Sequence, residues 1–327
     1  MFTPTAHAAK SESAANTSRS TRDEAIRAIP TDKLSEAGQQ KVASVLKQIS
    51  IFRRLPTQVI ECDPNLYLFL IEHPEMVVNM WEVMDVSDMK LEKVGPDQYK
   101  MNDGAGTIGK VDMLWHTHDL HVMYAEGAYS GPMFAGAVKG RCLLVLKTGY
   151  VRETNGKYFI TCRLDTFIQL ENVGLEFVAR TFQPMIGKTA DHNFRETAAF
   201  MAMISRSAEV QHPSLRKLTD QLTVPTDADR AEFVSITNRI GATARELDEG
   251  EAEQTVAISP AAPVKPATTR QQSKPLAMTT ARMIPSGTQT PPPSASSSSS
   301  APAPSNWPKA PIPGGTRKTV MKPSTAR

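Results

Sequence analysis

The chain has 327 residues, a formal net charge of +3 and three cysteines. Its charge is uneven, because residues 251–327 carry nine basic and two acidic side chains and leave a net charge of −4 on residues 1–250. An acidic body argues against nucleic-acid binding by the folded part. The cysteines form no CxxC pair and no run of about 18 apolar residues occurs, so neither a zinc motif nor a transmembrane helix is predicted.

The composition predicts one folded domain between two disordered segments. Residues 251–327 hold 14 of the 24 prolines and cannot bury enough apolar surface to order themselves. Residues 1–28 are small and polar, and we expect them to be disordered too. The predicted domain covers residues 29–250, with its core at 55–209 and a helical extension at 213–247. Scattered basic residues in the tail predict only weak contact with a protein or an anionic surface.

The N-terminus leaves the location of the protein open. Ala6-His7-Ala8 resembles the end of a signal peptide, but no charged and apolar regions precede it. We expect a cytoplasmic protein, consistent with the odd number of cysteines. A secreted or periplasmic protein is the alternative if the true start lies further upstream.

The periodicity of apolar residues predicts a mixed order of helices and strands. An amphipathic helix is expected at 32–50, an extended segment at 55–62 and two helices separated by Pro74 within 64–84. Strands follow at 89–94, 99–101, 107–118, 120–128, 140–151 and 157–170, and residues 175–182 form a last strand or lead into a helix. Helices are expected at 189–209, 213–222 and 227–247.

The helix expected at Thr189–Glu209 is the element around which the rest is organised. Its apolar residues recur at three- and four-residue spacing and predict a deeply buried face: Phe194, Ala198, Met201, Ile204 and Ala208. We therefore predict an α+β fold in which a curved antiparallel sheet wraps around this C-terminal helix, with extra flanking helices.

This order of elements resembles the helix-grip fold of the START and polyketide-cyclase-like superfamily. The resemblance covers about Leu55 to Glu209 and rests on the apolar hairpin followed by a long helix at Gly140–Glu209. The connection at 181–188 is longer than is usual in that superfamily. The resemblance implies a cavity between sheet and helix that holds a lipid, a polyketide or a similar apolar small molecule.

Aromatic and polar side chains of the expected strands and helix are candidates for lining such a cavity. The apolar candidates are Trp115, Tyr124, Phe159, Phe194 and Met201, and the polar candidates are Glu126, Tyr129 and Arg163. The competing interpretation assigns the aromatic residues to an ordinary hydrophobic core.

Three histidines near the 107–128 hairpin form a candidate metal site. His116 and His118 project to one face of a strand, and His121 could fold back beside them with Asp119. Exposed histidines at the end of a strand are the simpler interpretation, and no metal or other cofactor is predicted.

His192 and Glu126 are candidate catalytic groups for acid–base chemistry in the same cavity. Against this, Asp191 is most simply a helix cap, and Glu196 with its neighbouring arginines forms a solvated helix face. Gly104, Gly106 and Gly109 match GxGxxG, but a strand follows them instead of a helix, so we expect a bend in the sheet and no dinucleotide site.

Three classes of function remain open on the sequence alone. The first is a binding module for an apolar small molecule or a lipid. The second is a cyclase or hydrolase that uses a histidine and a glutamate in the cavity. The third is a structural or adaptor protein tethered by its proline-rich tail.

Overall fold

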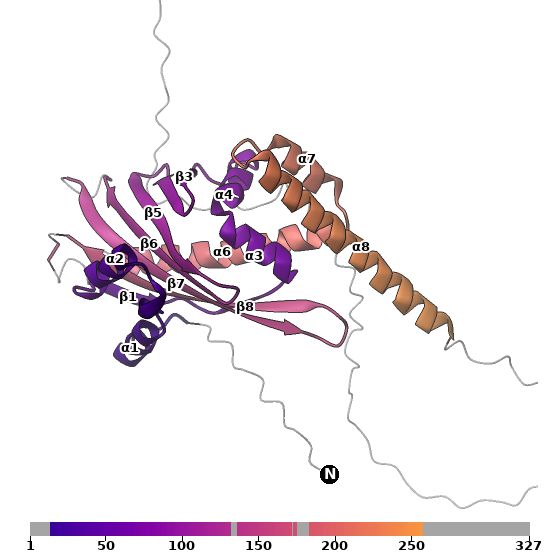
Figure 1. The fold of residues 1–327 in the computed structure, drawn as a ribbon, viewed down its shortest axis with the longest axis horizontal. Coiled ribbons are helices and arrows are strands. Elements are labelled where there is room, and N and C mark those ends of the chain that lie inside the picture. Colours follow the sequence, from indigo (N-terminus) through magenta and orange to yellow (C-terminus); the bar gives the residue numbers. More distant parts are fainter. Residues whose placement is uncertain (1–13, 132–135, 172, 175–182, 258–327) are drawn as a thin grey trace, which may run out of the picture. The chain divides into compact units, whose positions relative to one another are not determined.

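The computed structural model describes residues 14–131, 136–171, 173–174 and 183–257 (Figure 1). The chain divides into two compact units, one made of Met1–Glu249 and Pro308–Arg327 and the other of Gly250–Trp307. All elements below belong to the first unit, except the last residues of the final helix. The fold is α+β, as predicted, with a curved antiparallel sheet and long helices after it.

The sheet has eight strands, and every hydrogen-bonded pair is antiparallel. In chain order the strands are β1 Ile51–Arg54, β2 Gln58–Glu61, β3 Lys90–Gly95, β4 Gln98–Asn102, β5 Thr107–His116, β6 Leu120–Tyr129, β7 Val138–Arg152 and β8 Tyr158–Leu170. Their spatial order is β1-β8-β7-β6-β5-β4-β3, with β2 also paired to β8. Pro56, which has no N–H to donate to a ladder, lies between the two short strands.

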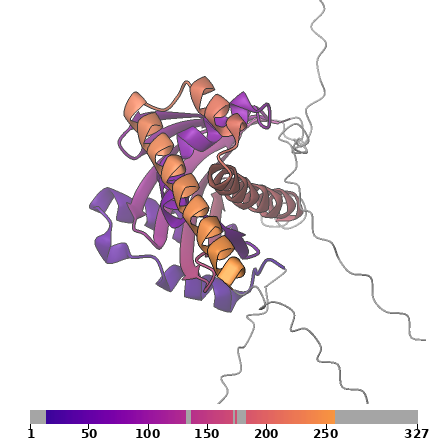
Figure 2. The same ribbon diagram turned by 90° about the vertical axis from the view of Figure 1, so that its right-hand side faces the viewer.

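The helices divide between the two faces of the sheet (Figures 1 and 2). We call the face covered by α1 Arg19–Arg27 and α2 Glu36–Leu46 the outer face. The face that carries α3 Pro64–Glu72, α4 Pro74–Val83 and α6 Gln183–Glu209 is the inner face. A short 3₁₀ turn, η1 Thr31–Lys33, joins α1 to α2, and α7 Pro213–Gln221 and α8 Asp227–Ala257 follow α6.

Turn chemistry explains two of the sharpest bends. Asn155-Gly156 closes the β7–β8 hairpin, and Gly156 has φ +84°, a region that glycine enters without steric cost. Gly104 and Gly106 have φ +70° and +113° between β4 and β5. The glycine-rich motif is therefore a bend between two strands, as the sequence predicts.

The structure corrects four expected boundaries. Helix α1 and a bridge from Asn16 to Arg54 lie within the segment expected to be disordered, of which residues 1–13 lie outside the described residues. Strand β1 follows α2 directly and is missing from the prediction. Helix α6 begins at Gln183, six residues earlier than expected, because a proline in the first helical turn needs no hydrogen-bond partner for its nitrogen.

The fourth correction concerns the C-terminal end of the domain. Helix α8 continues to Ala257, beyond the expected limit at 247. The segment at 175–182 and residues 258–327 lie outside the described residues. None of the helices in the described part of the chain is both long and apolar enough to cross a membrane.

Candidate functional site

An apolar surface runs across the inner face of β5, β6 and β7. The register aligns Met113, Met123 and Leu144 in one row and Val111, Ala125 and Cys142 in the next. All six side chains are partly exposed. We call these six residues the inner apolar surface.

The inner apolar surface continues toward β3 and α4. Val78, Leu91 and Tyr99 form a buried cluster there, against which Trp81, Met101 and Val111 pack while remaining partly exposed. Methionine side chains are flexible and polarisable, so they can adapt to the outline of a bound molecule. The inner face therefore presents a wide, deformable apolar lining on the side of the sheet that carries α6.

One end of the inner face is closed by helix α3. Tyr67 of α3 is buried, and its hydroxyl lies 3.3 Å from Thr148 Oγ1 and 3.0 Å from Cys162 Sγ. Burial raises the pKa of Tyr67, and also raises that of the Cys162 thiol to about 11 and that of the Cys142 thiol to about 12. These thiols are protonated at neutral pH and do not act as nucleophiles.

His121 lies at this closed end, paired across the sheet with His116 and Leu146. Its side chain is fully buried, and within the described part of the chain neither ring nitrogen has a hydrogen-bond partner. Burial, together with the neighbouring His116 and His118, lowers the pKa of His121 to about 4 despite the opposing charge of Asp119. The imidazole is therefore neutral at pH 7. Burying its ring nitrogens without hydrogen bonds costs folding free energy, and the enclosed ring is not open to a ligand.

The three histidines do not form a metal site. The ring of His116 lies 6.2 Å from that of His121, and its Nδ1 is 3.5 Å from Glu72 Oε1. His118 instead packs against the Tyr150 ring at 4.1 Å. Within the described residues, no group of three or more His, Cys, Asp or Glu side chains could hold a metal ion.

The candidates for lining a cavity are divided between the two faces. Tyr124 is buried and Trp115 half-buried in the outer core formed with α1 and α2. Glu126 accepts a hydrogen bond from the Tyr124 hydroxyl at 3.0 Å, and Arg163 lies 3.5 Å from Glu24 of α1. Phe159 is also on the outer face, where it pairs with Glu61 and Val151.

Tyr129, Phe194 and Met201 lie on the side of α6. Tyr129 has the same strand parity as Met123, and Met201 is buried on α6, where its carbonyl accepts a weak bond from Cys62 Sγ at 3.8 Å. Phe194 is partly exposed one helical turn before Ala198. The structure thus brings part of the predicted set to the inner face and leaves the rest outside it.

His192 and Glu126 do not come together. His192 Nδ1 lies 3.0 Å from Arg195 Nη2 and 3.6 Å from Glu196 Oε1 on α6, and its Nε2 is buried without a hydrogen-bond partner among the described residues. Glu126 points to the outer face of β6. Asp191, expected as a cap, instead pairs with Arg53 of β1 and fastens α6 to the edge of the sheet.

Most of the inner apolar surface lies outside the set of residues predicted from the sequence. The available signal is the alternation of side chains along 121–127, which groups His121 with Met123 and Ala125 and separates them from Tyr124. A bulge between Met113 and Trp115 breaks this alternation in β5, so a strict period of two assigns Trp115 to the wrong face.

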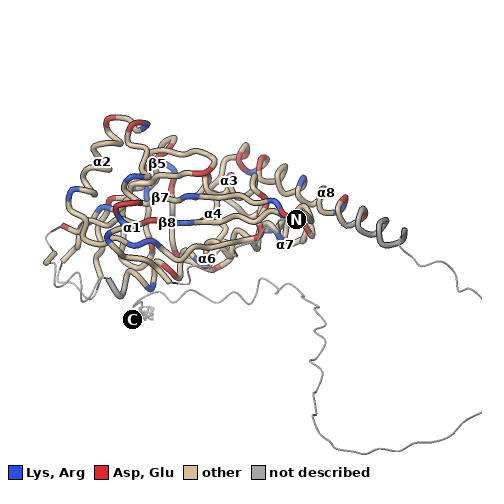
Figure 3. Tube along the Cα trace, turned by 90° about the horizontal axis from the view of Figure 1, so that it is seen from below, with Lys and Arg blue, Asp and Glu red and all other residues tan. Residues whose placement is uncertain are grey.

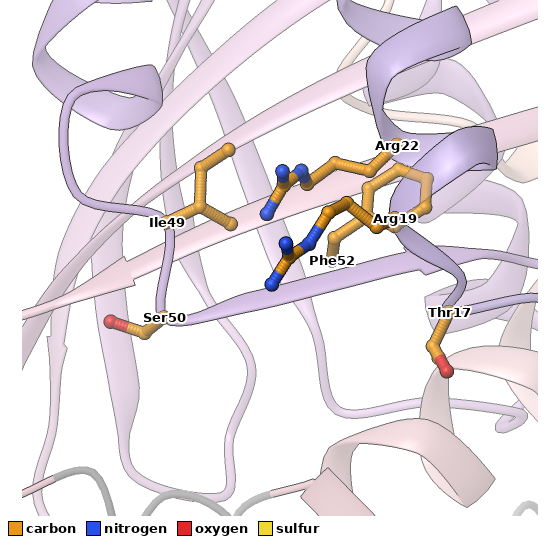
Figure 4. A pocket seen from close by; sticks show the side chains of 6 residues that line it. All are labelled: Thr17, Arg19, Arg22, Ile49, Ser50 and Phe52. Carbon is orange, nitrogen blue, oxygen red and sulfur yellow. The ribbon is translucent and has the colours of Figure 1, made fainter.

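A separate pocket opens at the start of α1, between that helix and β1 (Figure 4). It has a volume of about 230 Å³ and is lined by Thr17, Arg19, Arg22, Ile49, Ser50 and Phe52. Elsewhere in the described residues basic and acidic side chains are interspersed along helices and strands (Figure 3). This pocket differs because two guanidinium groups point into the same hollow.

No family model matches the chain, and no curated protein matches it. Among solved structures, a conserved protein from Geobacillus kaustophilus is similar at 12% identity and a TM-score of 0.32, over 46% of this chain and 93% of that one. The di-domain ARO/CYC StfQ from the steffimycin biosynthetic pathway is similar at 12% identity and a TM-score of 0.28, over 56% and 60%.

The human StarD13 lipid transfer and protein localization domain is similar at 11% identity and a TM-score of 0.25, over 45% of this chain and 76% of that one. At such identities and TM-scores these structures carry no argument about the family or the ligand of this chain.

Proposed function

We propose that this chain is a binding protein that holds an apolar small molecule or a lipid on the inner apolar surface, between the sheet and α6. The observation that supports the proposal is the contrast between adjacent residues of one strand. Leu143 and Val145 on the outer face are fully buried, whereas Cys142 and Leu144 on the inner face remain partly exposed.

Partial exposure of apolar side chains costs free energy, at about 25 cal/mol for each Å² left in contact with water. A contiguous apolar surface of this kind is typical of a binding site. The three methionines on or beside it, Met101, Met113 and Met123, favour a ligand recognised by its apolar shape.

Binding is favoured over catalysis because the described residues bring no acid–base pair to this surface. The carboxylate of Glu126 and the imidazole of His192 are held on separate faces by their own partners. The Cys142 thiol is itself part of the inner apolar surface, and its raised pKa keeps it protonated.

The test fills the site with a larger side chain. We expect the full chain to bind the neutral fluorescent probe N-phenyl-1-naphthylamine, and Ala125→Phe to weaken that binding at least about tenfold, because the added ring occupies the inner apolar surface. Ala128→Phe is the matched control, since Ala128 lies on the same strand but faces outward beside Ile108.

Circular dichroism and thermal unfolding establish that both variants fold. Equal probe binding by the wild type and both variants would place the probe elsewhere on the molecule. Absence of binding by the wild-type chain to this probe and to a set of fatty acids and sterols would overturn the proposal.

A further inference from the structure

The pocket at the start of α1 carries an excess of positive charge. Arg22 donates from Nε and Nη2 to Asp23 Oδ1, at 3.1 and 3.0 Å, so its charge is partly compensated. Arg19 is exposed and has no hydrogen-bond or ion-pair partner among the described residues. Two guanidinium groups that share one hollow repel each other unless an anion lies between them.

The start of helix α1 also favours an anion at this pocket. Thr17 and Ser50 line it with their hydroxyls turned away from the two guanidinium groups (Figure 4), and Ser50 Oγ accepts from the Leu170 N–H. Both arginines lie in the first turn of α1, where the helix dipole favours negative charge. Arginine presents its N–H groups in a fork that matches the oxygens of a phosphate.

The apolar part of the lining limits the kind of ligand. Ile49 and Phe52 supply the apolar part of the lining (Figure 4). At about 230 Å³ the pocket has room for a phosphate group and a small organic substituent beside it. We propose that this pocket binds a phosphomonoester, with Arg19 and Arg22 holding the phosphate and Ile49 and Phe52 contacting the organic group.

The proposal is independent of the inner apolar surface. The pocket lies beside α1, at the edge formed by β1, whereas the inner apolar surface lies on β5–β7 on the opposite face of the sheet. The phosphate could belong to a free metabolite or to the headgroup of a lipid, and the two sources share the same recognition chemistry.

The experiment measures binding of phenyl phosphate and inorganic phosphate to the full chain by calorimetry at low and high salt. We expect phenyl phosphate to bind more tightly than inorganic phosphate, and both affinities to fall as salt rises. Arg19→Gln and Arg22→Gln should each weaken phenyl phosphate binding about tenfold, as expected for loss of a charge-assisted hydrogen bond.

Arg27→Gln is the matched control, because it removes the same charge from an exposed position in the last turn of the same helix. Equal weakening by Arg27→Gln would show a general charge effect and overturn the proposal, as would absence of binding by the wild type. Arg19→Gln and Arg22→Gln should bind N-phenyl-1-naphthylamine as the wild type does. That result would distinguish this pocket from the inner apolar surface.

Vesicles of phosphatidylcholine with and without phosphatidic acid distinguish the two sources of phosphate. Vesicle binding that requires phosphatidic acid and Arg19 would assign the pocket to a lipid headgroup. Binding of phenyl phosphate without vesicle binding would assign it to a free phosphomonoester. Both outcomes support the site, whereas phenyl phosphate binding that stays unchanged in the Arg19 and Arg22 variants would contradict it.

Discussion

The two faces of the sheet differ in how completely their apolar side chains are buried. On the outer face, α1 and α2 close over Phe52, Val122, Leu143, Val145 and Phe167, and each of these side chains is at most 6% exposed. On the inner face the same strands present methionine, alanine and leucine side chains that remain partly exposed. The outer face under α1 and α2 is thus closed, whereas the inner apolar surface remains partly exposed beside the packed end under α3.

The outer face also contains a buried network of charges. Arg54 Nε and Nη2 lie 2.6 and 3.0 Å from the two oxygens of Asp165, and Arg54 Nη1 lies 3.0 Å from Glu24 Oε2 on α1. The hydrogen bonds that Arg54 donates to the Asp165 carboxylate raise the pKa of Arg54 above its ordinary value. This network attaches the N-terminal helix to β1 and β8.

The largest predicted effect comes from breaking this buried pair. Asp165→Asn should lower the free energy of unfolding by about 3–5 kcal/mol, because it leaves the Arg54 guanidinium buried with an incomplete set of acceptors. Glu24→Gln, at a half-exposed position, should cost about 1 kcal/mol or less. Urea unfolding measures the loss of free energy of unfolding in each variant. Equal losses would contradict the prediction that the buried Asp165 stabilises the fold more than the half-exposed Glu24.

The second prediction compares neighbours on β7 that face opposite sides. Leu143→Ala should lower the free energy of unfolding by about 3 kcal/mol, because Leu143 is fully buried in the outer core. Leu144→Ala should cost about 1 kcal/mol, since Leu144 is already partly exposed. Probe binding should fall only in the Leu144 variant. Equal costs for the two variants would show that the inner face is packed as tightly as the outer one.

These comparisons indicate which parts of the structure follow from the sequence. The meander from β3 to β8, the Asn155-Gly156 hairpin and the long helix after the sheet follow from local periodicity and turn chemistry, whereas the pairing of β1 and β2 with β8 does not. Helix α1 does not, because it has few apolar residues and is held by Glu24 through partners that are distant in sequence. Local composition contains no signal for such contacts.

The candidate site is less predictable than the fold. The sequence predicts aromatic residues as cavity lining, but Tyr124 and Trp115 belong to the outer core. Which face of a strand is buried against which helix depends on the pairing register, and a single bulge reverses the assignment. The two arginines at the pocket come from a segment whose composition resembles a disordered terminus.

The third prediction concerns acid sensitivity of the inner face. The pKa of His121 is about 4 in the folded protein, below the ordinary value of 6.5, because burial disfavours the charged ring. The unfolded chain therefore binds more protons between these two values, so stability falls as pH drops from 6.5 toward 4 and then levels off. Between pH 7 and pH 5 this contribution amounts to about 2 kcal/mol.

Replacement of His121 isolates this contribution. Urea unfolding of His121→Leu should show a loss between pH 7 and pH 5 that is smaller than that of the wild type by about 2 kcal/mol. The comparison stops at pH 5 because the Glu24 carboxyl, with its pKa lowered by Arg54, is still ionised there. His118→Leu is the matched control, since His118 is exposed on the Tyr150 ring and should keep the wild-type pH dependence. A wild-type pH dependence in His121→Leu would mean that the His121 ring titrates alike in the folded and the unfolded chain, as it would if water reached it. The inner face would then be wetter at its closed end than the packing under α3 indicates.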